Sequence, residues 1–266
     1  MANQCALSDD GSMTKPPKSQ KKQAKKTRVD QLLVERELVE SRTRAQALIM
    51  AGTVFSGETK IDKPGQQLAS DAPLEVRGRD HPYVSRGGVK LAGALDAFAL
   101  DPAGLVVADF GASTGGFTDC VLQRGATKVY AIDVGYGQLH NKLRQDPRVV
   151  VMERTNARHL DAESLPEPVD LVVIDASFIS LAKLLDAAIA VLAEGGAIVG
   201  MIKPQFEVGQ HKTVKGVVRD PVLREQAIQK VITDAEARGL RLRARAESQL
   251  AGPKGNVEAF VWLERA

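Results

Sequence analysis

A glycine-rich turn directly after an apolar run is the segment of this sequence best suited to hold a ligand. Residues 106–110 are apolar except for Asp109, as in a buried parallel strand, and the run Gly-Ala-Ser-Thr-Gly-Gly follows at 111–116. Glycines allow a tight turn and let a ligand approach the backbone closely. A second apolar run ends at Asp133, whose carboxylate can accept hydrogen bonds from ribose hydroxyls. The spacing predicts a nucleotide-type site at the carboxyl edge of a Rossmann-like sheet.

The spacing of the glycines distinguishes this turn from one that binds a dinucleotide. A dinucleotide site would have glycine at position 113, where this chain has Ser113. The form Gly-x-x-x-Gly-Gly resembles the first motif of S-adenosylmethionine-dependent methyltransferases, in which the turn holds a methionine zwitterion. With the positions that follow the other strands, the resemblance implies that S-adenosylmethionine is bound by Asp109, Gly111, Ser113, Gly115, Gly116, Phe117, Asp133, Asn156 and Asp175. The alternative is a strand-to-helix turn that binds no ligand.

Four charged residues stand beside predicted buried strands. Lys90 opens the C-terminal domain, Asp175 ends one apolar strand and Lys203 follows another, while Glu258 is expected to begin the final strand. Charges next to buried strands are costly to desolvate unless they are paired, and two lysines and two acids would nearly balance. The set resembles the Lys-Asp-Lys-Glu tetrad of FtsJ-like ribose 2′-O-methyltransferases. The alternative is that each charge meets solvent separately at the sheet edge.

The resemblance implies attack by a ribose hydroxyl, which is a poor nucleophile, on a sulfonium methyl carbon. Holding the two partners at near-attack distance supplies much of the acceleration. A lysine can deprotonate such a hydroxyl only if burial and a cationic neighbour lower its pKa. We expect Lys203 to orient or deprotonate the hydroxyl and Asp175 to hold the Lys203 ammonium near the methyl group. Lys90 and Glu258 would position the substrate. An acid beside Lys203 opposes a decrease in pKa, so a true base and an orienting donor both stay open.

An alternating order of strands and helices must position these residues. Strands are predicted at 105–109, 128–132, 148–152, 170–174 and 197–202, with two more after 240, and helices notably at 117–124, 179–192 and 221–238. Such alternation implies a mostly parallel, doubly wound sheet whose ligands lie beyond the carboxyl ends of the strands. The fold class expected for this part is α/β, a Rossmann-like class I methyltransferase domain.

Residues 27–77 predict a separate, small α+β unit. Val29, Leu32 and Leu33 share one face of a short helix, and Ser41 supplies the N-cap of a second helix that Gly52 ends. Short β pieces are expected at 53–55, 59–61, 63–65 and 74–76. The arginines of this unit stand at the starts of the two helices, where they could form the basic edge that recognition of a nucleic-acid backbone requires.

This unit resembles the ribosomal S-four (S4) type RNA-binding domain. The resemblance is carried by the run 28–33, by Ser-Arg-Thr-Arg-Ala at 41–45, by Leu-Ile at 48–49, by the glycine at 52 and by Lys-Pro-Gly at 63–65. It implies that Arg28, Arg42, Arg44 and Lys63 bind RNA. The alternative is a small packing or dimerisation domain with ordinary surface arginines.

The remaining segments are an N-terminal tail, a linker between the two units and a basic loop in the C-terminal domain. Residues 1–26 are polar and rich in lysine, which predicts a disordered basic tail that either solubilises the chain or finds phosphates. Residues 78–84 are predicted to be a linker and 85–266 the catalytic domain. A basic loop that contains glycines follows residue 203. It is expected either to bind a splayed nucleotide or to be a flexible surface loop. Its residues are Phe206, Gly209, Lys212, Lys215, Gly216 and Arg219.

The composition favours a cytoplasmic protein. Only two cysteines occur among 266 residues, which suggests a reducing compartment, and no apolar stretch reaches the length of a membrane span. The histidines show no metal-ligand spacing, and no metal is expected; they are His81, His140, His159 and His211. The net charge of +3 does not by itself identify a polyanionic partner.

From residue 28 onward the sequence is similar to the TlyA/haemolysin-A family of ribosomal RNA methyltransferases. The shared strings lie at 81–91, 109–117, 175–180, 203–207 and 255–258. The similarity implies 2′-O-methylation of cytidine, S-adenosylmethionine as donor, and ribosomal RNA or ribosomal subunits as partners. It leaves open which subunit is modified, whether free RNA or an assembled subunit is the substrate, and the oligomeric state. The alternatives are a non-catalytic ribosome-assembly factor and a lytic protein, for which the sequence has no long basic amphipathic helix.

Overall fold

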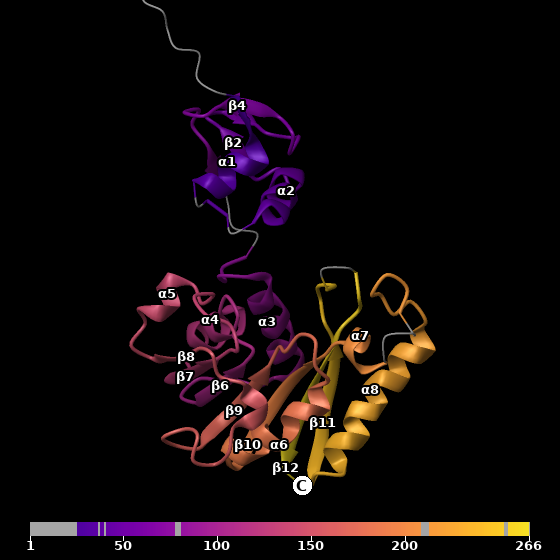
Figure 1. Cartoon of the computed structure of the whole chain (residues 1–266). Coiled ribbons are helices and arrows are strands. Elements are labelled where there is room, and N and C mark those ends of the chain that lie inside the picture. Colours follow the sequence, from indigo (N-terminus) through magenta and orange to yellow (C-terminus); the bar gives the residue numbers. More distant parts are fainter. Residues whose placement is uncertain are drawn as a thin grey trace, which may run out of the picture. The chain divides into compact units, whose positions relative to one another are not determined.

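The computed structural model describes residues 26–36, 38–39, 41–77, 81–208, 213–252 and 255–265. The chain forms two compact units, divided between Asp80 and His81 (Figure 1). The predicted disordered tail lies outside the described residues except for Lys26, and the predicted linker is described only from His81 onward.

Within the described residues, the N-terminal unit contains two helices and five short strands. They are β1 (Lys26–Arg28), α1 (Val29–Glu35), α2 (Arg42–Met50), β2 (Val54–Ser56), β3 (Thr59–Lys60), β4 (Gln67–Ala69) and β5 (Glu75–Val76). β1 pairs with β4, and a three-stranded sheet has the order β3-β2-β5. Both predicted helices are present, and the core between them and the strands contains Val29, Leu33, Ala45, Ile49 and Val54.

The local signals at the second helix act as expected. The Ser41 side chain accepts a hydrogen bond from the backbone N–H of Arg44, and Gly52 follows the helix with a φ of 73°. The predicted β piece at 63–65 is wrong, because these residues form a turn in which the Gln66 N–H donates to the Lys63 carbonyl. β1 and β4 were not predicted; β1 continues directly into α1, and β4 follows the turn that was read as a strand.

The C-terminal unit follows the alternating order. Its elements are α3 (Arg86–Phe98), β6 (Val106–Phe110), α4 (Gly116–Gln123), β7 (Lys128–Ile132), α5 (Asn141–Arg144), β8 (Val149–Met152), the 3-10 helix η1 (Ala157–His159), β9 (Val169–Ile174), the 3-10 helix η2 (Leu181–Leu184), α6 (Leu185–Val191), β10 (Leu192–Ile202), α7 (Pro204–Glu207), α8 (Pro221–Glu236), β11 (Leu240–Glu247) and β12 (Ala259–Arg265). The seven-stranded sheet has the order β11-β12-β10-β9-β6-β7-β8. Strands β6 to β10 pair in parallel and β12 pairs antiparallel to both neighbours, which confirms the mostly parallel, doubly wound α/β sheet.

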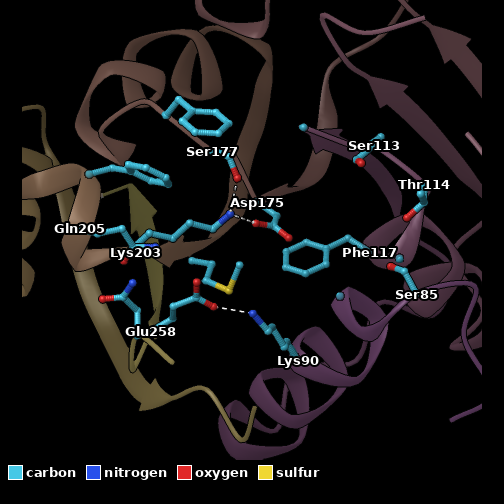
Figure 2. A pocket seen from close by; sticks show the side chains of 18 of the residues that line it. Ser85, Lys90, Ser113, Thr114, Phe117, Asp175, Ser177, Lys203, Gln205 and Glu258 are labelled. Atoms are coloured by element: carbon cyan, nitrogen blue, oxygen red, sulfur yellow. Dashed lines mark hydrogen bonds and ion pairs between the residues drawn. The ribbon is translucent and has the colours of Figure 1, made fainter. Parts of the chain in front are cut away.

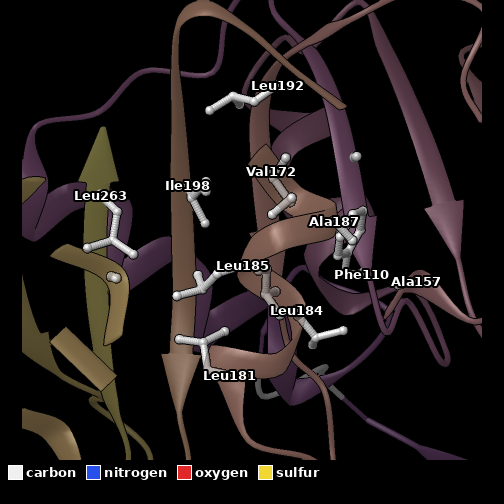
Figure 3. Packing of buried hydrophobic residues seen from close by; sticks show 14 of the residues in the cluster. Phe110, Ala157, Val172, Leu181, Leu184, Leu185, Ala187, Leu192, Ile198 and Leu263 are labelled. Carbon is white, nitrogen blue, oxygen red and sulfur yellow. The ribbon is translucent and has the colours of Figure 1, made fainter. Parts of the chain in front are cut away.

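Helices cover both faces of this sheet (Figure 1). Alternate strand residues face opposite ways, so Val107 and Val173 pack with α3 and α4, whereas Phe110 and Val172 pack with α6 and α8. Figure 3 shows the second face, where Leu181, Leu184 and Leu185 lie against the sheet. These leucines anchor the segment that follows the carboxyl end of β9 firmly in the core.

Several predicted boundaries differ from the structure. The helix predicted at 179–192 begins as a 3-10 turn at Leu181, and Leu192 already belongs to β10, which is longer than predicted. α3 was not predicted as a helix, because Gly87 and Gly88 in its first turn are poor helix formers. Glu258 lies just before β12 and not within it, and α8 ends at Glu236.

Candidate active site

A cavity of about 760 Å³ lies beyond the carboxyl ends of β6, β9 and β10 (Figure 2). Its volume is in the range of small-molecule sites. It is surrounded by the starts of α3 and α4 and by the segments after β9 and β10. The loop before α8 and the loop before β12 complete its lining. All of these segments meet at one edge of the sheet, as the strand order requires.

The glycine turn between β6 and α4 owes its shape to steric constraints. Gly111 has a φ of +88°, and a Cβ there would lie 2.7 Å from the carbonyl oxygen of Asp175. Gly115 has a φ of +93°, and a Cβ there would lie 2.1 Å from a methyl carbon of Leu143. Both positions therefore need glycine for backbone conformation and for space. The turn is thereby held close against β9 and against the segment around α5.

Five of the nine residues predicted to bind the cofactor surround the cavity: Gly111, Ser113, Gly116, Phe117 and Asp175. The other four, Asp109, Gly115, Asp133 and Asn156, are not among the residues that line it. Each of these four residues instead contacts nearby parts of the protein, in or beside the glycine turn or within its own loop.

Asp109 is fully buried beneath the turn. One of its carboxylate oxygens accepts hydrogen bonds from the backbone N–H of Thr118, at 2.9 Å, and from the Thr118 hydroxyl, at 2.6 Å. Burial raises the pKa of Asp109 to about 7. The carboxyl group thus fastens the first turn of α4 to the end of β6.

Asp133 and Asn156 also bond to nearby backbone. The Asp133 carboxylate accepts from the N–H of Ser113, at 2.8 Å, and from the N–H of Gly135, at 2.7 Å. The exposed Asn156 accepts from the N–H of Arg158 and caps η1. Asp133 therefore joins the glycine turn to the loop after β7, whereas Asn156 acts within its own loop.

The structure brings together the four charged residues, hereafter the charge tetrad (Lys90, Asp175, Lys203 and Glu258). Lys90 Nζ lies 2.5 Å from Glu258 Oε2, and Lys203 forms an ion pair with Asp175. The Lys203 ammonium also donates to Ser177 Oγ at 3.0 Å. Figure 2 shows both pairs pointing into the same cavity.

The side chains of the tetrad have little contact with solvent, and Asp175 is the most exposed of the four. The exposed fractions of the side chains are 9% for Lys90, 1% for Glu258, 10% for Lys203 and 25% for Asp175. Charges in such surroundings are tolerated because each has a partner, and they act strongly on any group that enters. Lys203 uses two of its three N–H donors on Asp175 and Ser177, so the third can reach an oxygen atom of a bound molecule.

Other cavity residues were missed at the sequence level. Ser85, Ser177, Met201 and Gln205 all line the cavity, and the signal for Ser177 was its place two residues after Asp175. Ser85 and Gln205 are single polar residues without a spacing of their own, and Met201 reads as an ordinary apolar residue of its strand.

Two phenylalanines stand at the cavity. Phe178 is 91% exposed, has a φ of 66°, and lies with its ring centroid 5.3 Å from that of Phe206. From the predicted basic loop, Phe206 and Gly216 line the cavity, whereas Lys215 and Arg219 are exposed and do not. Gly209 and Lys212 lie outside the described residues.

In the N-terminal unit, two of the three predicted RNA-binding arginines, Arg28 and Arg42, contact one buried acid. The Asp30 carboxylate has no exposed surface and accepts hydrogen bonds from Arg28 at 2.9 Å, from Arg42 at 3.1 Å and from the Gln46 amide at 3.0 Å. The hydrogen bond from Arg28 holds the pKa of Asp30 well below its usual range. The two arginine side chains are themselves 42% and 50% exposed.

The other two predicted RNA-binding residues lie apart from the Asp30 carboxylate. Lys63 is exposed and lies in a turn whose Pro64 carbonyl accepts a hydrogen bond from the Asp30 N–H. Arg44 lies two residues after Arg42 in α2. The turn stays close to Arg28, since a Cβ at Gly65 would lie 3.4 Å from the Arg28 guanidinium.

Neither a metal-binding cluster nor a membrane-spanning helix is found in the part of the chain that the structure describes. The described residues include no cluster of three or more His, Cys, Asp and Glu side chains arranged to hold a metal ion. They also include no helix that is long and apolar enough to cross a membrane.

Comparison with known proteins matches both units. Residues 83–265 match the FtsJ-like methyltransferase family and residues 27–72 match the S4 domain. The 16S/23S rRNA (cytidine-2′-O)-methyltransferase TlyA of Mycobacterium tuberculosis is 48% identical over 90% of this chain and 90% of its own length. Hemolysin A of Brachyspira hyodysenteriae is 38% identical over 87% of this chain and 97% of its own.

A solved structure shows the same likeness in three dimensions. A protein of Streptococcus thermophilus named as a hemolysin has a TM-score of 0.75 and 40% identity, and the match covers 91% of this chain and 89% of that chain. Family match, identity and coverage agree along nearly all of the sequence. The chain therefore belongs to the TlyA/haemolysin-A family, in which an S4 domain is joined to an FtsJ-like methyltransferase domain.

Proposed function

We propose that this protein transfers a methyl group from S-adenosylmethionine to the 2′-hydroxyl of a cytidine ribose in ribosomal RNA. The observation that carries the proposal is the convergence of the charge tetrad beside the glycine turn in one cavity. The identity with TlyA, which is named for this reaction, supports the choice of substrate.

The cavity fits the cofactor. Gly111 and Gly116 line the cavity without side chains of their own, so a ligand can approach their backbone, and Phe117 supplies an apolar wall. The Asp133 carboxylate accepts from the Ser113 N–H and thereby fixes the turn, and we assign it to the ribose hydroxyls of the cofactor. When bound, S-adenosylmethionine supplies an electrophilic methyl carbon.

Lys203 is the residue that we assign to the acceptor hydroxyl. Its ammonium is held from two sides, by Asp175 and by Ser177, which leaves one N–H to hydrogen-bond the ribose oxygen. A fixed donor at this point orients the hydroxyl for in-line attack, and a water-excluded site strengthens that interaction. Transfer would form the ribose O–C bond and break the donor's S–C bond, whose electron pair stays on sulfur. The hydroxyl proton would pass to the Lys203 nitrogen if that lysine is neutral, and to water if Lys203 acts only as an orienting ammonium.

The second ion pair has a different task. Glu258 is almost fully buried and Lys90 reaches it from α3, so this pair connects two sides of the cavity that are distant in the sequence. We assign to the pair the positioning of the ribose and the charge balance of the tetrad.

RNA would be held by both units. In the N-terminal unit, Arg28 and Arg42 present guanidinium groups that Asp30 holds in place. We assign to the same surface Arg44, from α2, and Lys63, from the turn at 63–66. In the catalytic unit, Phe178 and Phe206 offer aromatic faces on which a splayed base can stack.

The domain limits and the location belong to the same proposal. We assign 27–77 to RNA binding and 85–266 to catalysis, joined by a linker at 78–84. A cytoplasmic location, where ribosomal RNA is found, fits this activity.

The test is incubation of the purified protein with ribosomal subunits or free ribosomal RNA and methyl-labelled S-adenosylmethionine. Nuclease digestion should release the label as 2′-O-methylcytidine. Label in a base, or no label in any RNA while the cofactor binds, would contradict the proposal.

A further inference from the structure

Glu207, at the end of α7, is a partly buried carboxylate that the proposed chemistry does not use. It lies four residues after Lys203. One of its oxygens accepts a hydrogen bond from the Ser180 hydroxyl at 2.6 Å, and the other accepts from the Leu181 N–H at 2.9 Å. Glu207 thus connects the segment after β10 to the segment after β9.

The two segments are therefore tied at both ends. At one end Lys203 contacts Asp175 and Ser177, and at the other end Glu207 contacts Ser180 and Leu181. The loop 175–180 lies between the ties and includes Phe178. Beyond the second tie, Leu181 packs into the core (Figure 3), so Glu207 links α7 to a rigid part of the molecule.

The loop needs such fixing. Phe178 has a φ of 66°, in the left-handed region that a phenylalanine rarely adopts, and its side chain is 91% exposed. A backbone of this kind is strained and persists only where its surroundings over-determine it. The ring is mostly exposed and lies against the Phe206 ring of α7. Glu207 joins α7 to the segment after β9, so its hydrogen bonds support both this ring contact and the backbone beside Phe178.

The surroundings of Glu207 also show that its carboxylate is retained at a cost. Burial raises the pKa of Glu207, while from α8 Lys230 acts to lower it and Asp234 to raise it further. A partly buried acid loses some of its hydration, and its hydrogen bonds to Ser180 and Leu181 offset this loss.

We infer that Glu207 is a positioning residue that holds the loop 175–180, and with it the contact of Ser177 with Lys203 and the placement of Phe178 at the cavity. This inference rests on the proposed function, because it assigns Glu207 a part in that reaction. Glu207 acts through Lys203 and Phe178 and touches no reacting atom.

The experiment compares the full-length protein with Glu207→Ala, Glu207→Gln and Ser180→Ala. The control is Glu167→Ala, which removes a carboxylate that likewise accepts two hydrogen bonds, from Lys128 and Tyr130, but lies before the amino end of β9. Hydrogen exchange of 177–184 reports the loop, and single-turnover methyl transfer to RNA across a range of pH reports the chemistry.

We expect Glu207→Ala to slow transfer about 10–100-fold, since a displacement of about 1 Å has effects of this size. Exchange in 177–184 should become faster, and the pH–rate profile should shift because Ser177 no longer fixes the Lys203 ammonium. Glu207→Gln should recover part of the rate, because its amide oxygen can still accept from Leu181. Ser180→Ala should lie between these variants, and Glu167→Ala should stay within about twofold.

Unchanged exchange in 177–184, or faster exchange with an unchanged transfer rate and pH profile, would overturn the inference. A slower rate that matches only the loss of folded protein would overturn it too. If the unmodified protein methylates no RNA, the proposed function fails, whereas the exchange measurement still shows whether Glu207 holds the loop.

Discussion

The N-terminal unit and the catalytic cavity both depend on acids paired with bases, but they bury opposite partners. Around Asp30 the acid is buried, and the two arginines that contact it are about half exposed. In the tetrad the lysines are buried almost as deeply as Glu258. The first arrangement presents oriented positive charge to a large anionic surface. The second places charge where only a group inside the cavity can meet it. The depth at which the cation lies thus distinguishes the proposed RNA-binding surface from the proposed reaction site.

The largest effect is expected from Lys203→Ala, which removes the cation assigned to the acceptor hydroxyl. Single-turnover methyl transfer should fall by about 10²–10⁴, the usual contribution of a positioned acid–base group. Binding of S-adenosylmethionine, measured by calorimetry, should change little. Lys183→Ala, which removes an exposed lysine from η2, is the matched control. Full turnover in Lys203→Ala would show that this side chain is not needed for the chemistry.

Lys90→Met should sharpen the comparison through stability. It leaves Glu258 buried without its cation, and removal of one partner from a buried pair costs about 3–5 kcal/mol. Denaturant unfolding measures the loss. The double variant with Glu258→Gln should regain much of it, because no unpaired charge is then buried. A single variant as stable as the unmodified protein would mean that solvent reaches this pair.

Asp30→Asn should weaken the other cluster in a pH-dependent way. Arg28 keeps the pKa of Asp30 low in the folded state, so the carboxylate stabilises the protein above its unfolded pKa, near 4. This contribution is lost as the pH falls through the folded pKa. At pH 7 the variant should be less stable by about 2 kcal/mol, the scale of hydrogen bonds to a charged group. Denaturation should show the difference shrinking below about pH 4. A difference that does not vary with pH would exclude this ionic role.

The smallest effect is expected for Arg42→Ala in RNA binding. Loss of one phosphate contact should weaken binding about tenfold and reduce the salt slope by about 1. Arg77→Ala, in the same unit, is the control, because Glu58 and Glu75 already occupy its guanidinium. Titrations at several salt concentrations decide the matter. An unchanged slope with unchanged affinity would remove Arg42 from the RNA surface.

The sequence predicted the tetrad and the parallel sheet because both depend on patterns along the chain. Asp175 and Lys203 directly follow apolar runs, and the carboxyl ends of neighbouring parallel strands must meet at one edge. The S4 helices were readable from the serine cap and the glycine stop around α2.

What could not be predicted depends on packing between distant segments. The fastening of Thr118 by Asp109 and the contact of Gly115 with Leu143 are visible only once the turn is folded. The positive φ of Phe178 has no sequence signal, because the hydrogen bonds that hold it come partly from Glu207 on another segment. α3 was missed because tertiary packing on the sheet outweighs the low helix propensity of its two glycines.

The most direct test of the central claim uses an RNA substrate with one changed atom. The target cytidine, once mapped, is replaced by 2′-deoxycytidine in an otherwise identical RNA, and transfer of labelled methyl is measured in a single turnover. The tetrad acts on a ribose oxygen, so the deoxy substrate should bind with nearly unchanged affinity and accept no label. Label transferred to the deoxy substrate at the normal rate would show that the methyl group goes elsewhere on the nucleotide, and would contradict the roles assigned to Lys203 and its partners.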